Sequence, residues 1–191
     1  MEKQSEEVKL HVSVRDLVEF IFREGDIDNR AGRLAQTAMM EGSRIHRKIQ
    51  QSMGAGYKAE VPLALCVEAE DYVLEVEGRA DGIFYMTEEA VKAIWEEEGL
   101  YDQLTLDLEE KSERDDACGS TGLKGGRFYI DEIKGVYRNV AAMERAQYVH
   151  LAQAMCYAYI YALQNGQEQM GVQMTYCNLD NEMQRHFREE F

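Results

Sequence analysis

Two short segments hold acidic and basic side chains whose spacing would let them act together. Glu132 and Lys134 lie two residues apart in the segment 128–135, whose other residues favour a β-strand. Residues two apart in a strand point to the same face, so a carboxylate and an ammonium group are held side by side. Asp81 ends an earlier apolar run, close to Gly78. If the two strands are neighbours, Asp81 and Glu132 form an all-oxygen site for a divalent cation.

Such a trio has a clear use in phosphodiester hydrolysis. Carboxylate oxygens suit Mg²⁺ or Mn²⁺, which lowers the pKa of a bound water and offsets negative charge at the reacting phosphate. Lys134 would orient or deprotonate the attacking water. The alternative is a surface Glu–Lys pair and an aspartate in a turn. Either segment alone favours that alternative, whereas the two together, in this order, favour the catalytic site.

The order of these motifs resembles the RecB-like branch of the PD-(D/E)XK nuclease superfamily. The resemblance starts from Gly-x-x-Asp, ending at Asp81, and Asp-Glu-Ile-Lys, ending at Lys134. In that branch an upstream helix carries a metal-binding histidine, which His46 matches. A helix after the lysine carries Gln-x-x-x-Tyr, which Gln153 and Tyr157 match. Glu60 matches an acidic position that is often present, although less firmly.

The resemblance implies roles for these residues. Asp81, Glu132 and the carbonyl of Ile133 would bind one Mg²⁺ or Mn²⁺, and His46 would help to hold that ion or a second one. Gln153 and Tyr157, one helical turn apart, would orient the lysine and position the DNA strand. The candidate phosphate contacts are Arg44, Arg47, Lys48 and Arg138. Without the family context, His46 reads as part of a solvated basic face and Gln153 as a packed polar group.

The sequence also departs from the family. Ala80 stands where the superfamily's name has proline, although the Gly-x-x-Asp form is familiar in this branch. Some relatives carry four cysteines around an iron–sulfur cluster. Here the four cysteines are widely separated, without the closely spaced trio near the C-terminus; they are Cys66, Cys118, Cys156 and Cys177. We therefore expect no iron–sulfur cluster, and reduced, mostly buried thiols.

Length and composition indicate one folded domain over residues 1–191 with a long acidic insertion. The 191 residues are 45% hydrophobic, enough for one core. The net charge is −15, of which −9 falls between Thr87 and Cys118. We expect this stretch to belong to a solvated insertion at about 87–126, with one helix near 88–98 and a Gly-rich loop at 119–126. The acidity argues against tight unaided binding to DNA.

The rest of the sequence bears on the binding partners and the cellular location of the protein. No segment approaches the ~20 apolar residues of a membrane span, and the N-terminus lacks a signal peptide's apolar core, so we expect no membrane and a cytoplasmic protein. The C-terminal residues resemble nuclease domains that precede a superfamily 2 helicase. By analogy, a C-terminal helicase domain in the parent chain could deliver the DNA strand.

The hydrophobic pattern predicts a mixed α/β (α+β) fold with a restriction-endonuclease-like αβββαβ core, a central mixed sheet flanked by helices. Ser13 and Asp16 predict a capped helix after a short first strand. The remaining expected elements are a helix over 29–52, an antiparallel meander over 57–85 with a turn at 70–71 and a bend at Gly78, a strand over 127–134, a helix over 139–163, a strand over 169–178 and the start of a helix over 181–191.

These observations predict a metal-dependent deoxyribonuclease that acts as an exonuclease on single-stranded DNA ends in DNA repair or processing. Two alternatives remain open. A catalytically inactive module could keep the nuclease fold and bind nucleic acid or a partner, attached to a helicase. An acidic docking domain with accidental motif matches would instead hold Asp81, Glu132 and Lys134 far apart in space.

Overall fold

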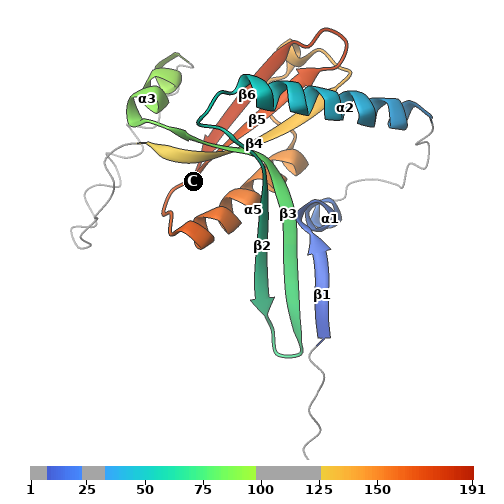
Figure 1. Cartoon of the computed structure of the whole chain (residues 1–191), viewed down its shortest axis with the longest axis vertical. Helices are drawn as coiled ribbons and strands as arrows, with labels where there is room; N and C mark the ends of the chain where they lie inside the picture. The colour runs from blue at the N-terminus through green and yellow to red at the C-terminus, as the bar shows by residue number, and fades with distance from the viewer. Residues whose placement is uncertain (1–7, 23–32, 98–125) are drawn as a thin grey trace, which may run out of the picture. The chain divides into compact units, whose positions relative to one another are not determined.

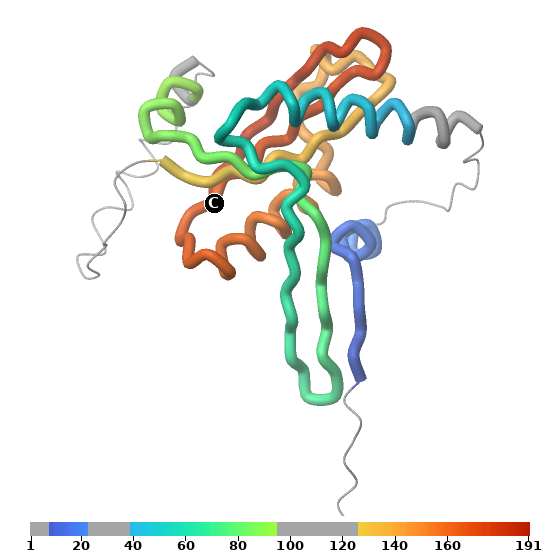
Figure 2. Tube along the Cα trace, in the orientation of Figure 1, coloured from blue at the N-terminus to red at the C-terminus, as the bar shows by residue number. Residues whose placement is uncertain are grey.

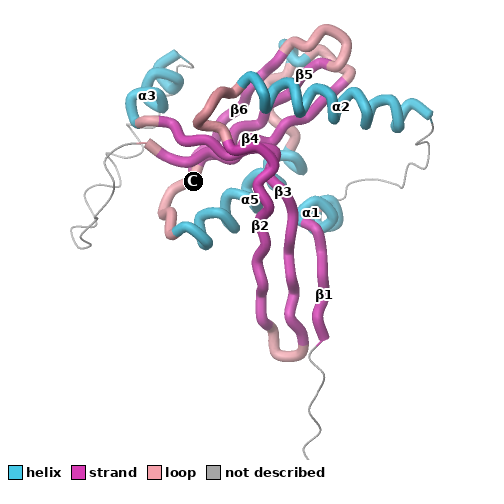
Figure 3. The backbone as a smooth tube through the Cα atoms, viewed as in Figure 1, coloured by secondary structure: helices cyan, strands magenta, loops and turns pink. Residues whose placement is uncertain are grey.

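The computed structural model describes residues 8–22, 33–97 and 126–191, with side chains omitted for 33–38 and 95–97. Figure 1 labels the elements, and Figure 3 colours helices and strands separately. They are β1 (Val8–Ser13), α1 (Val14–Ile21), α2 (Arg33–Ser52), β2 (Lys58–Glu68), β3 (Tyr72–Met86), α3 (Glu88–Glu97), β4 (Arg127–Val136), the 3₁₀ turn η1 (Val140–Ala142), α5 (Tyr148–Asn165), β5 (Gly171–Asn178) and β6 (Gln184–Glu190).

The fold class is mixed α/β, as the sequence predicts. Six strands form one sheet in the order β1-β3-β4-β5-β6, with β2 paired to β3 outside this path. The β1–β3 and β4–β5 pairs are parallel, whereas β2–β3 and β5–β6 are antiparallel. The order α2-β2-β3-β4-α5-β5 supplies the expected αβββαβ sequence of elements.

The two long helices pack on opposite faces of β4 and β5. On one face, Ile45 and Ile49 of α2 join a buried cluster with Ile133, Cys177 and Leu179. On the other face, α5 lies against the alternate residues of the same strands, because its Gln153 bonds to Lys134 and its His150 to Tyr176. The sheet is therefore covered on both sides, and β5 is buried along its whole length.

Gly135 lets α2 approach the sheet closely. A Cβ on this residue would lie 2.7 Å from Leu179 Cδ2 and 3.4 Å from the Cα of Gly42, which belongs to α2. A larger residue would push the helix away from β4. Because α2 carries His46, this contact sets the height of the histidine above the strands.

The N-terminal elements agree with the predicted pattern. Ser13 caps α1, since its hydroxyl accepts a hydrogen bond from the Asp16 backbone N–H at 3.0 Å. α2 ends at Ser52, just before Gly54, which has φ +78°; residues 29–32 of the predicted helix lie outside the described residues. β2 and β3 form a long hairpin that turns at residues 69–71, clear in the trace of Figure 2, and β3 continues through Gly78.

The predicted C-terminal helix over 181–191 is wrong. Residues 184–190 form β6, which pairs antiparallel with β5, so 169–178 is not the last strand either. The Gln, Arg and Glu residues of this segment favour a helix locally. Edge pairing along β5 overrides that preference, and it places His186 and Arg188 opposite Thr175 and Gln173.

The predicted helix over 139–163 begins too early. Asn139 Oδ1 accepts a hydrogen bond from the Ala141 N–H, which closes a single 3₁₀ turn, and α5 begins only at Tyr148. Val140 and Met143 are buried, so this connection packs against the body of the unit. The helical spacing of its apolar residues reflects that packing rather than a longer helix.

The chain divides into two compact units, 1–84 with 129–191, and 85–128. The second unit coincides closely with the predicted insertion; within it, α3 follows Thr87, whose hydroxyl accepts from the Ala90 N–H at 3.3 Å. Most of the Gly-rich loop lies outside the described residues. Of the described helices, none is long and apolar enough to cross a membrane.

The cysteines are free thiols but less buried than predicted. Cys177 is buried, Cys156 is partly exposed and Cys66 is exposed, whereas Cys118 lies outside the described residues. Cys66 sits on β2 at a position that faces solvent, because the hairpin of β2 and β3 is covered less completely than β5.

Removing the α2 anchor should destabilise the fold. Ile45→Ala deletes a side chain that is 1% exposed, and we expect a loss of about 2–4 kcal/mol in the free energy of unfolding. Met40→Ala, on the same helix but 66% exposed, should change it by less than about 0.5 kcal/mol. Urea denaturation followed by circular dichroism measures both; equal losses would show that α2 is not anchored through Ile45.

Candidate active site

A hydrogen bond between neighbouring strands joins the two predicted motifs. The Ile133 backbone N–H donates to Asp81 Oδ2 at 2.8 Å. Ile133 lies between Glu132 and Lys134, so Asp81 of β3 sits beside the motif of β4. The accidental-match alternative requires these residues to lie far apart, and the structure contradicts it.

His46 reaches the same point from α2. Its Nδ1 lies 3.2 Å from Asp81 Oδ1, so the two oxygens of Asp81 contact a peptide N–H and an imidazole. Burial lowers the pKa of His46, but the hydrogen bond to Asp81 and the negative charges of Asp81 and Glu132 outweigh it. The pKa therefore lies above its ordinary value.

Glu132 is buried, with 2% of its surface exposed. Its Oε1 lies 2.7 Å from Lys134 Nζ, whereas its Oε2 is buried without a hydrogen-bond partner among the described residues. Burial, together with repulsion by Asp81, raises the pKa of Glu132 against the opposing pull of Lys134 and His46. A buried carboxylate oxygen without a partner is costly, so this group is poised to accept a cation or a proton.

α5 holds the lysine in place. Lys134 Nζ donates to Gln153 Oε1 at 3.1 Å, and Gln153 is itself largely buried. Tyr157, one turn later, packs over Gly78, where a Cβ would lie 2.7 Å from its ring and hydroxyl. Burial and the charge of Glu132 raise the pKa of Tyr157, so the phenol stays neutral. Gln153 and Tyr157 therefore lie beside the motif strands, as the resemblance implies.

Sequence reasoning missed Gln50. Its side-chain amide donates to the Asp81 carbonyl at 2.9 Å and to Glu60 Oε1 at 2.8 Å. Glu60 is exposed, pairs with Arg79 at 2.7 Å, and has φ 55°. Glu60 thus contacts Gln50, the side chain that bonds to the Asp81 carbonyl, rather than the buried carboxylates. Gln50 lies four residues after His46 on the same helix face, and that spacing is the signal that could have identified it.

Sequence reasoning also assigned no role to Asp131. Its side chain points to the face opposite Glu132 and is fully buried. Thr175 Oγ1 donates to it at 2.6 Å and Tyr57 Oη at 2.9 Å. The Tyr57 ring occupies the space above Gly82, where a Cβ would lie 1.9 Å away. Tyr57 therefore links the strand of Asp81 to the strand of Glu132 from the far side of the sheet.

The predicted phosphate contacts do not form one cluster. Arg44 lies 2.9 Å from both Glu41 and Glu182, and Lys48 also pairs with Glu182. The Arg47 side chain donates to the Ser43 carbonyl at 3.2 Å on the exposed side of α2. Because Glu182 engages two of these three cations, they are poorly placed to attract phosphate.

Arg138 lies elsewhere, beyond the end of β4. Its guanidinium carbon is 5.9 Å from the centre of the Tyr176 ring. The Tyr176 hydroxyl accepts from the Gln147 N–H and lies 3.0 Å from His150 Nδ1. Burial, followed by the positive charges of Lys134, Arg138 and Arg15, lowers the pKa of His150 to about 4. Three cationic side chains therefore act on this end of α5, opposed by Glu19.

The described residues contain no ready-made group of three His, Cys, Asp or Glu side chains around a metal position. The donors are nonetheless adjacent, since Asp81 contacts His46 directly and contacts the peptide that follows Glu132. Each carboxylate is partly engaged by a protein partner, His46 or Lys134. Binding a cation would require these hydrogen bonds to rearrange locally.

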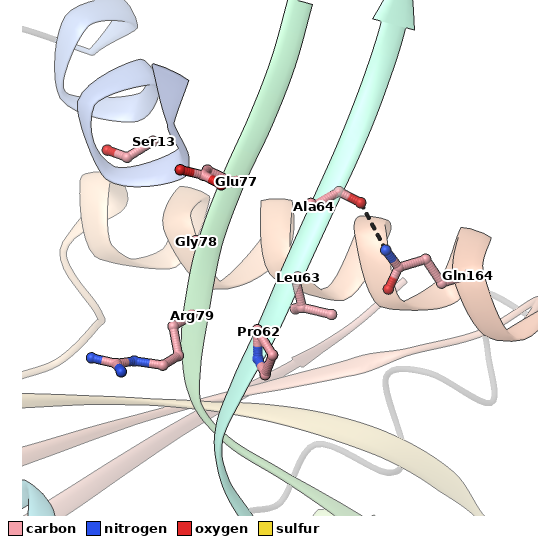
Figure 4. A pocket seen from close by; sticks show the side chains of 8 residues that line it. All are labelled: Ser13, Pro62, Leu63, Ala64, Glu77, Gly78, Arg79 and Gln164. Atoms are coloured by element: carbon pink, nitrogen blue, oxygen red, sulfur yellow. Dashed lines mark hydrogen bonds between the residues drawn. The ribbon is translucent and has the colours of Figure 1, made fainter. Parts of the chain in front are cut away.

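A separate cavity of about 540 Å³ lies where β2 and β3 cross α5 (Figure 4). Gln164 donates to the Ala64 carbonyl at 2.7 Å beside it, which ties the helix to β2. The cavity is lined by Ser13, Pro62, Leu63, Ala64, Glu77, Gly78, Arg79 and Gln164. None of the predicted metal ligands lines it, so it is distinct from the candidate site.

Comparisons with known proteins bear on the fold. No protein-family model and no curated protein matches the sequence. Among solved structures, the chain is similar to SSO0001, with a TM-score of 0.50 and 14% identity over 99% of this chain and 69% of that one. This likeness supports the fold alone. The resemblance to RecB-like nucleases stays a prediction.

His150 should make stability sensitive to acid. An unfolded chain protonates a histidine near 6.5, whereas folded His150 takes up its proton only near pH 4. Between these values the unfolded chain binds the extra proton, so stability falls as the pH falls from about 6.5 to about 4. His150→Gln should reduce that fall by about 1 kcal/mol, a value discounted because solvent reaches part of the ring.

Urea denaturation at a series of pH values measures this difference. His11→Gln is the matched control, because the His11 side chain is 59% exposed and lies on β1. Parallel stability curves for the wild type and His150→Gln would contradict the assignment.

Proposed function

We propose that this chain is a metal-dependent nuclease of the RecB-like type, which acts as an exonuclease on single-stranded DNA ends in the cytoplasm during DNA repair or processing. The supporting observation is the arrangement around the Asp81–Ile133 hydrogen bond, which brings two carboxylates, an imidazole and an ammonium group together. The preference for single-stranded ends follows from the resemblance.

The donors suit a hard divalent cation. Glu132 Oε2 is buried and has no hydrogen-bond partner in the part of the chain that the structure describes, which is the state of a carboxylate oxygen that a cation would satisfy. Asp81, Glu132 and the Ile133 carbonyl would hold Mg²⁺ or Mn²⁺, with His46 as a further ligand. Such an ion supplies an activated water and charge neutralisation at the phosphate.

Lys134 is the residue whose role distinguishes a catalytic site from an ion pair that is only structural. Its ammonium group is fixed between Glu132 Oε1 and Gln153 Oε1, at 2.7 and 3.1 Å. Two acceptors set the direction of its third donor and keep the charge close to the site. Lys134 would therefore orient the attacking water and stabilise negative charge on the scissile phosphate. Gln153 positions the lysine, and Tyr157 would contact the DNA backbone.

A second candidate function is an inactive module that keeps the fold and binds nucleic acid or a partner, attached to a helicase. The contacts around the carboxylates favour it, because Asp81 is already bonded to His46 and Ile133 and Glu132 to Lys134. The net charge of −15 points the same way. Metal binding distinguishes the two candidates.

Lys134→Ala should abolish most of the hydrolytic activity. We expect Mn²⁺-dependent degradation of end-labelled single-stranded DNA to fall by at least about 100-fold, because the variant loses the charge beside the phosphate. Lys9→Ala, an exposed lysine of β1, should leave the rate unchanged. Equal rates for the wild type and Lys134→Ala would remove the catalytic assignment.

Asp81→Asn should weaken metal binding while preserving the strand contact, because an asparagine carbonyl can still accept from the Ile133 N–H. Calorimetric titration should show Mn²⁺ affinity lowered by at least about tenfold, since a neutral amide replaces a carboxylate ligand. Glu77→Gln, on the same strand, is the control. Wild-type protein that binds no Mn²⁺ would favour the inactive module.

A further inference from the structure

The connection between β4 and α5 builds a large groove that the proposed chemistry does not use. Its volume is about 1250 Å³, and its lining comes from this connection, the first turn of α5, the end of α1 and one residue of β6. The residues are Phe22, Arg138, Asn139, Ala142, Met143, Glu144, Arg145, Ala146, Gln147, Tyr148, Val149, Leu151 and Glu189. The late start of α5 leaves this space open, since 143–147 are not helical.

Two aromatic rings stand in this groove. Phe22 and Tyr148 pack edge to face with their centres 4.9 Å apart and their planes at 87°. Tyr148 is nonetheless 65% exposed. Phe22 thus fixes the orientation of a tyrosine ring that still presents surface to solvent. A nucleic-acid base can stack on such a ring whatever its sequence.

Two arginines supply positive charge to the same groove. Arg138 is held over the Tyr176 ring, and Tyr176 lies in register with Lys134 on the neighbouring strand. Arg145 is exposed and makes no ion pair with another described residue. The groove therefore begins two residues beyond the end of β4, the strand that carries Lys134.

The charged residues in and around the groove are of both signs. Lys134, Arg138 and Arg15 all act on His150, which lies at this end of α5. Glu144 and Glu189 also line the groove and oppose the two arginines. A duplex, with phosphates on two strands, would meet these carboxylates as well as the arginines. A single strand can place its phosphates on the arginines and a base on Tyr148.

We propose that this groove binds one strand of nucleic acid next to the active site, with a base stacked on Tyr148 and phosphates at Arg138 and Arg145. The proposal rests on the proposed nuclease function and adds the subsite that selects single strands. Stacking supplies the preference for unpaired bases, and the two arginines supply the phosphate contacts.

Tyr148→Ala tests the stacking contact. Binding of labelled oligo-dT and oligo-U to the full chain is measured by fluorescence anisotropy in EDTA, where no cleavage occurs. The substitution should weaken binding at least about fivefold. The matched control is Tyr159→Ala, on the same helix and 56% exposed but outside the groove, which should not change the affinity. Weaker binding of either oligonucleotide by Tyr148→Ala than by Tyr159→Ala supports the proposal.

Arg145→Gln tests the phosphate contact. The slope of log affinity against log salt concentration should become shallower by about 0.7, the value for one phosphate of a single strand. Lys9→Gln should leave the slope unchanged. Equal effects of Tyr148→Ala and Tyr159→Ala, tighter binding of a duplex, or equal displacement by polyglutamate would each overturn the proposal.

The same assay separates this subsite from the hydrolytic function. Binding is measured in EDTA, where neither metal binding nor hydrolysis contributes, so the affinity reports on the groove independently of the proposed chemistry. Selective loss of strand binding in Tyr148→Ala would support the groove even in a protein without hydrolytic activity. Hydrolysis of single strands by a protein whose affinity does not depend on Tyr148 would overturn the groove alone.

Discussion

The burial of Glu132 constrains the rest of the structure. A carboxylate inside a sheet loses its water, and only one of its oxygens meets a cation, the ammonium group of Lys134. Asp81 adds a second negative charge nearby, and the pKa of Glu132 rises in response. A fold selected for stability alone would replace this pair with apolar residues, because a buried ion pair seldom repays its desolvation. The arrangement makes physical sense if the site exchanges a proton, a metal ion or a phosphate with its surroundings.

The fold meets this constraint by approaching the site from three directions. α2 supplies His46 and Gln50, which bond to the side chain and the carbonyl of Asp81. α5 supplies Gln153 to Lys134. On the same face of the sheet as α2, Tyr57 bonds to buried Asp131. Each contact restrains a different side chain of the site. The geometry of the site therefore depends on the packing of helices against both faces of the sheet.

The sequence was most informative where a local pattern and the tertiary structure favour the same outcome. Spacing by two placed Glu132 and Lys134 together, and a capping serine predicted the start of α1. The C-terminal strand was missed because its polar residues favour a helix, and only pairing with β5 makes it a strand. Asp131 and Tyr57 were missed for a related reason, since they are 74 residues apart and meet across the sheet. The partner of Arg44 and Lys48 is farther still along the chain, 138 and 134 residues away, because Glu182 lies in the connection before β6.

The charge distribution bears on the proposed binding of nucleic acid by an acidic protein. Of the net charge of −15, the stretch from Thr87 to Cys118 carries −9. Around the N-terminal end of α5, burial lowers the pKa of His150, and the positive charges of Lys134, Arg138 and Arg15 lower it further. A strand that binds near the N-terminal end of α5 would meet these cations directly, and at physiological salt the charges within about 10 Å act on it most strongly.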